Sequence, residues 1–97
     1  MNTPSVPVLV AKEDIHRLRI PNKEVLTDAL DIHQRKADLE SAMKLGNNEH
    51  NKVKIIFQCD EGVMVVETTV WEVTQNYVIL KSNTHLPIRS IYKVEFL

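Results

Sequence analysis

The sequence has little of what marks a secreted or membrane-bound chain. Its 97 residues contain one cysteine, Cys59, so no intramolecular disulfide can form. Cys59 also falls in an alternating segment, which predicts a buried thiol rather than a reactive one. The apolar stretch at residues 6–11 is too short, and too interrupted by Pro7, for a signal or membrane segment. We therefore expect a cytoplasmic protein that makes no contact with a membrane.

Groups that carry chemistry are equally sparse. The 12 basic and 13 acidic residues leave a net charge of -1, which offers no long-range attraction for nucleic acid. Four histidines (His16, His33, His50 and His85) are too scattered for a metal site, and His33 has no second ligand four residues on. No phosphate-binding loop or paired nucleophile and base occurs. The sequence therefore predicts a non-enzymatic protein with no metal and no cofactor.

The N-terminal residues 1–21 are predicted to be a tail. They hold three of the four prolines and show no sustained period, which favours a segment ordered only by packing on the rest of the chain. A short helical turn beginning near Lys12 would direct Ile15 and Leu18 inward. Residues 22–97 are then expected to form a single domain.

Residues 22–46 are predicted to be an amphipathic helix. Apolar residues recur there at spacings of three, four and seven, as on one stripe of a helix: Val25, Ala29, Ile32, Leu39 and Met43, widened by Leu26, Leu30 and Ala42. Asn22 is the expected N-cap, and Gly46 the expected stop. At about 1.5 Å per residue the helix would be roughly 35 Å long, more than a small barrel covers. We expect the uncovered part of its apolar stripe, the helix shoulder, to need a second surface, which is either the proline-rich tail or a second copy of the chain.

Residues 51–97 are predicted to form five short, strongly bent strands. In the first, the apolar odd positions Val53, Ile55, Phe57 and Cys59 should face the core. A three-residue hairpin loop ending at Gly62 should follow. The second strand, residues 63–74, is long, and its blurred phase near residues 67–69 indicates a bend.

The last three strands follow at short intervals. We expect Val78 and Leu80 to face inward from the third strand, and the fourth to open with Leu86 and Ile88. The fourth strand should be short or on an edge, because Pro87 cannot donate to a ladder. After a tight corner at Arg89 and Ser90, the fifth should bury Ile91, Val94 and Phe96. The predicted class is α+β: a long N-terminal helix followed by a five-stranded antiparallel barrel.

This order of elements resembles the Sm-like (SH3-type) small barrel. Residues 74–81 are similar to the second loop and third strand of the bacterial RNA chaperone Hfq, and residues 88–91 resemble the corner of the second Sm motif. The chain also resembles short bacterial proteins that combine a helix, a Thr-Thr-Val-Trp run and an Ile-Pro-Ile-like corner. The resemblance implies a small barrel that could bind RNA. However, Ser90 replaces the usual glycine, and neither the Asp-x-x-x-Asn loop nor the Tyr-Lys-His signature is present, so nucleic acid is not the favoured partner.

Six residues are candidates for contact with a partner: Trp71, Lys81, Arg89, Leu26, Leu30 and Met43. Trp71 could stack on a base, although a lone tryptophan more often fills a core or a barrel end. Arg89 and Lys81 could contact phosphate or stay solvated. We predict an interaction module that associates with itself, most simply as a dimer. The alternative is an Sm-like RNA-binding or regulatory protein, and an enzyme comes third.

Overall fold

A computed structural model describes residues 6–97; the first five residues of the predicted tail lie outside the described part. The chain is α+β, with one long helix, α1 (Ala29–Glu49), and a sheet-rich C-terminal part. The strands are β1 (Val8–Leu9), β2 (Val53–Cys59), β3 (Gly62–Thr68), β4 (Val70–Val73), β5 (Tyr77–Leu80), β6 (Thr84–Pro87) and β7 (Ile91–Phe96). Three 3-10 turns accompany them: η1 (Lys12–Arg17), η2 (Lys81–Asn83) and η3 (Ile88–Ser90).

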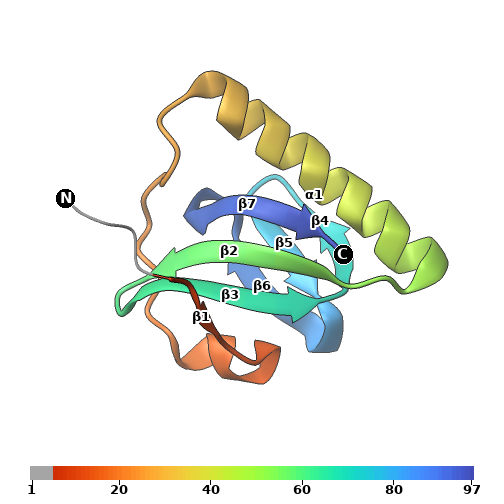
Figure 1. The fold of residues 1–97 in the computed structure, drawn as a ribbon, viewed down its shortest axis with the longest axis horizontal. Helices are drawn as coiled ribbons and strands as arrows, with labels where there is room; N and C mark the ends of the chain where they lie inside the picture. The colour runs from red at the N-terminus through yellow and green to blue at the C-terminus, as the bar shows by residue number, and fades with distance from the viewer. Residues whose placement is uncertain (1–5) are drawn as a thin grey trace.

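The strands form two sheets packed against each other. Sheet A has the order β1-β3-β2-β7 and sheet B the order β4-β5-β6, and no ladder joins the two sheets within residues 6–97. All neighbouring strands are antiparallel except β1, which runs parallel to β3. In Figure 1, β7, β2 and β3 cross the front of the molecule, with β5 and β6 behind them, α1 above and η1 below.

The core lies between the two sheets, and the predicted strand phases fill it. The odd positions of β2 are confirmed as buried, each at most 1% exposed, and Val78, Leu80 and Leu86 face them from sheet B. Ile91 and Val94 complete the core from β7, also as predicted. Cys59 is a buried free thiol.

Phe96 was predicted to be buried, and that prediction is wrong. Phe96 keeps the inward register opposite Val53, but it stands at the end of β7 and is 45% exposed. Register alone does not bury a side chain when the strand runs past the packed part of the core.

The bends and turns follow the prediction in part. The expected bend of the second strand occurs at Thr69, which is buried and divides that strand into β3 and β4. Gly62 has a φ of 131°, yet it pairs with Cys59, so the hairpin loop has two residues and not three. Ile88 lies in η3 and not in the fourth strand, whereas Pro87 is on edge strand β6 as expected.

The helix begins later than predicted. Asn22 is not its N-cap: α1 starts at Ala29, and the Asp28 side chain accepts a hydrogen bond from the Leu30 amide at 2.8 Å. Residues 18–28, which we call the strap, have no regular secondary structure. The Val25 amide donates to the Arg89 carbonyl at 3.0 Å, so this amide forms a tertiary hydrogen bond in place of one within a helix.

The helix also ends later than predicted. Gly46 is not a stop but a buried position inside α1, which continues to Glu49 and is capped by His50 with a φ of 58°. A Cβ atom on Gly46 would lie 2.3 Å from the Val70 carbonyl oxygen. Glycine is therefore required by the close approach of α1 to β4, which no local pattern reveals.

Two elements cover the seams between the sheets. α1 packs on β4 of sheet B and β7 of sheet A, and it buries Leu39 and Ala42. On the opposite side η1 packs on β6 and β3, with Ile15 fully buried. We call residues 6–17 the N-terminal arm. The predicted turn near Lys12 is thus confirmed, and the described part of the tail contributes to the core.

Candidate interaction surface

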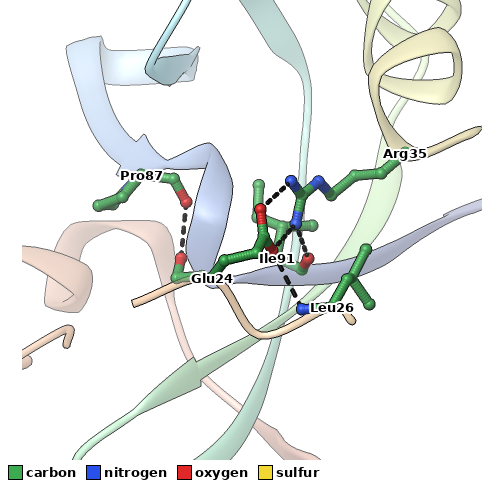
Figure 2. Close-up of polar contacts among 6 residues, drawn as sticks. Glu24, Leu26, Arg35, Pro87 and Ile91 are labelled. Carbon is green, nitrogen blue, oxygen red and sulfur yellow. Dashed lines mark hydrogen bonds and ion pairs between the residues drawn. The ribbon is translucent and has the colours of Figure 1, made fainter. Parts of the chain in front are cut away.

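A buried arginine fastens the strap to the rest of the molecule (Figure 2). Arg35 on α1 is only 5% exposed, and its Nη1 and Nη2 donate to the two carboxylate oxygens of Glu24 at 2.6 and 2.7 Å. Nη1 also donates to the Ile91 carbonyl at 2.9 Å, and the Leu26 amide donates to Glu24 Oε2 at 3.0 Å. Bidentate pairs of this kind are strong and geometrically specific. One ion pair therefore joins the strap, α1 and the start of β7.

The electrostatics of this pair suit a structural role. The hydrogen bond from Arg35 is the largest influence on Glu24, and it lowers the pKa of that carboxyl below the ordinary value of 4.5, against the opposing effect of partial burial. Glu24 is therefore ionised at neutral pH, and arginine is always charged. Both carboxylate oxygens accept hydrogen bonds from within the chain, so the pair holds the strap in place.

The outer face of sheet A carries a row of aliphatic side chains. Leu9 on β1, Val65 on β3 and Ile56 on β2 are register partners across three neighbouring strands. Leu9 is 69% exposed, and Val65 and Ile56 are half-buried. Because successive strand residues face opposite sides, and their neighbours Met64 and Phe57 fill the core, this row faces away from it.

Pro7 and Val63 widen this row into a shallow groove of about 660 Å³. Its aliphatic lining is Pro7, Ile56, Val63 and Val65; with Leu9 we call these five residues the outer patch. Tyr92 also lines the groove and donates through its hydroxyl to Gln58 Oε1 at 2.6 Å. In the outer patch only Leu9 is exposed and the other four residues are half-buried; contiguous, partly exposed aliphatic surface with a polar border is typical of a docking site.

A row of alternating charges borders the outer patch. Glu67 on β3, Lys54 on β2 and Glu95 on β7 are register partners on the same outer face. Lys93 lies opposite Ile56 and pairs with Glu95 at 3.1 Å. The border thus holds two positive and two negative side chains.

Trp71, Lys81 and Arg89 do not all gather in one site, although Lys81 follows β5 beside β4, the strand that carries Trp71. Trp71 is exposed on β4, where the pairing with β5 is irregular, so it is not a core plug. Lys81 starts η2, before β6, and Arg89 lies after β6, so a strand of about 13 Å separates them. Arg89 also donates to Asn22 Oδ1 at 2.8 Å.

The apolar candidates are mostly covered by the chain itself. Leu26 is half-buried in the strap, and Met43 packs against the core from α1. Leu30, at 79% exposed, is the one of the three that faces solvent. The helix shoulder that was expected to need a second surface is therefore reduced to a single leucine.

The outer patch was missed by the sequence reasoning, although one signal was present. Ile56 is aliphatic at a position of β2 where its neighbours on the same face, Lys54 and Gln58, are polar. The Glu24–Arg35 pair had no such signal, because its partners are 11 residues apart and the Ile91 carbonyl is 56 residues from Arg35.

Comparison with protein-family models, curated proteins and solved structures finds no match to this chain. Among residues 6–97 no helix is long and apolar enough to cross a membrane. In the same part of the chain, no three His, Cys, Asp or Glu side chains gather where they could hold a metal ion.

Proposed function

We propose that this protein is a non-enzymatic, cytoplasmic interaction module that associates with itself. One observation carries the proposal. The inner faces of β2 and β3 are already packed in the core, yet the outer faces of the same strands present Val65 and Ile56 beside the exposed Leu9. When a partner covers aliphatic groups that lie side by side, it removes them from water and so lowers the free energy of the complex.

We also propose that the architecture is a small barrel of the Sm (SH3-type) kind. The order β7-β2-β3 continues through the bend at Thr69 into β4-β5-β6, and η3 returns the chain to β7, which supports this assignment. Arg89 is engaged with Asn22 and lies far from Lys81, so no paired phosphate contact favours RNA. Protein interaction is therefore preferred over nucleic acid.

Light scattering coupled to size-exclusion chromatography tests this function across low to high micromolar concentrations. We expect the mass to rise with concentration from one chain of 11.2 kDa towards two. A mass of one chain at every concentration would remove self-association from the proposal. Tight, salt-sensitive binding of labelled single-stranded RNA, lost in Arg89→Ala, would replace it with the Sm-like alternative.

A further inference from the structure

We infer that the occupant of the outer patch is a second copy of this chain, related by a two-fold axis, with Lys54 of each copy set against Glu67 of the other. The inference rests on the proposed self-association and specifies its surface and its polar contacts. In a two-fold dimer the same patch of both subunits meets itself. The patch must therefore be complementary to itself in shape, hydrophobicity and charge.

The charges on this face meet that requirement. A border of one sign would repel its own copy, whereas this border has two lysines and two glutamates. Signs alternate along the row Glu67, Lys54, Glu95, so an offset of one strand, about 4.8 Å, places Lys54 of each copy opposite Glu67 of the other. The chain's net charge of -1 adds little general repulsion.

Lys54 and Glu67 are also available to a partner. Neither forms an ion pair with another side chain within residues 6–97, whereas Lys93 and Glu95 are paired with each other. Two unpaired charges beside an aliphatic row fix the orientation and register in which a partner binds. Because Glu95 is already engaged, Glu67 is the acceptor expected for Lys54.

The size of the face determines the strength of association to expect. The four strands lie about 4.8 Å apart and the longest have seven residues, so at about 3.3 Å per residue the face is roughly 15 to 20 Å wide and at most about 23 Å long. That footprint belongs to small interfaces and not to obligate dimers. Two such faces can pack about 10 Å apart, as sheets do in sandwiches, with the aliphatic rows at the centre. A dimer that dissociates on dilution follows.

Matched lysine substitutions test the location. Val65→Lys and Leu9→Lys place a charge in the outer patch; Leu9 is mostly exposed, so its variant leaves the core intact. Ile79→Lys is the matched control, since Ile79 is a half-buried aliphatic residue on the outer face of β5 in sheet B. We expect about tenfold or greater weakening of the dimer for the first two variants and no change for the control, measured by sedimentation equilibrium.

A charge exchange tests the pairing. We expect Lys54→Glu and Glu67→Lys each to weaken self-association, and an equimolar mixture of the two variants to recover a heterodimer. A dimer that tolerates both Leu9→Lys and Val65→Lys but is lost in Leu30→Lys would overturn this inference and leave self-association standing. Absence of any dimer in the unmodified chain would instead overturn the proposed function itself.

Discussion

α1 and the N-terminal arm cover opposite seams between the two sheets, and α1 buries more of its residues than the arm does. α1 spans 21 residues and buries Leu39, Ala42 and Gly46 along with Arg35. The N-terminal arm contributes a two-residue strand and one fully buried side chain, Ile15. Regions with few buried contacts open at lower free energy than the core. We therefore expect α1 to be the stronger of the two covers and the arm to be the weaker.

The weaker cover also carries part of the candidate interaction surface. Pro7 and Leu9 of the outer patch belong to the arm, and the Val10 amide donates to the Val65 carbonyl at 2.9 Å. Opening of the arm would remove these two residues from the patch and expose the edge of β3. Self-association and arm opening are thus expected to oppose each other.

The largest effect is expected for Leu39→Ala. Leu39 is fully buried on α1, so truncation loses transfer free energy and leaves a cavity, for a cost of about 2 to 5 kcal/mol in the free energy of unfolding. Urea denaturation followed by circular dichroism measures it. Leu30→Ala, on the same helix but exposed, is the control and should change stability little. Equal effects would show that α1 does not close its seam through Leu39.

Glu24→Gln tests the fastening of the strap to α1. In this variant the buried charge of Arg35 would have no carboxylate partner. The Glu24 side chain is 35% exposed, so we expect the free energy of unfolding to fall by about 1 to 3 kcal/mol, less than for a fully buried pair. Glu13→Gln, in the surface pair with Lys12, is the control and should have no measurable effect.

Acid should abolish the stabilisation of the folded state that Glu24 provides. Folding lowers the pKa of this carboxyl below 4.5, so its stabilisation is present above pH 4.5 and is lost as the pH falls through the lowered pKa. The difference in unfolding free energy between the unmodified chain and Glu24→Gln should therefore be largest near neutral pH and shrink in acid. A difference that grows in acid would contradict this sign.

Gly46→Ala probes the close approach of α1 to β4. The new Cβ would lie 2.3 Å from the Val70 carbonyl oxygen and 2.8 Å from Thr69 Cγ2, so the helix must shift. Overpacking costs about 1 to 3 kcal/mol, and the better helix propensity of alanine returns about 1 kcal/mol, so the net loss in the free energy of unfolding is at most about 2 kcal/mol. Asn47→Ala, at the next and exposed position, should be neutral or slightly stabilising.

The smallest effect on global unfolding is expected for Ile15→Ala. If the arm opens independently of the rest of the fold, Ile15→Ala lowers the free energy of unfolding only by the part that the arm contributes, about 1 kcal/mol. Hydrogen exchange checks this directly: the Val10 amide should lose protection while that of Ile55 in β2 keeps it. A global loss as large as that of Leu39→Ala would show that the two covers are equivalent.

The periodicity of the sequence predicted burial correctly where a residue's environment is set by its neighbours in the same helix or strand. The inward phase of β2 and the bend near residues 67–69 were predicted correctly, as was the inward turn of Ile15. The helix was identified, but both of its ends were placed too early. The strap contains helix-compatible residues, and its conformation is set instead by Arg89 and Arg35, which are distant in sequence.

By itself the sequence determined that a helix precedes a set of short strands and which faces of those strands are buried, because periods of 3.6 and 2 are properties of neighbouring residues. Tertiary structure alone decided that Gly46 lies against Val70, that Glu24 meets Arg35, and that Leu9 extends the row of Val65 and Ile56. Each of these depends on which elements become neighbours in space. The candidate surface belongs to this second group, since β1 completes it only by pairing with β3.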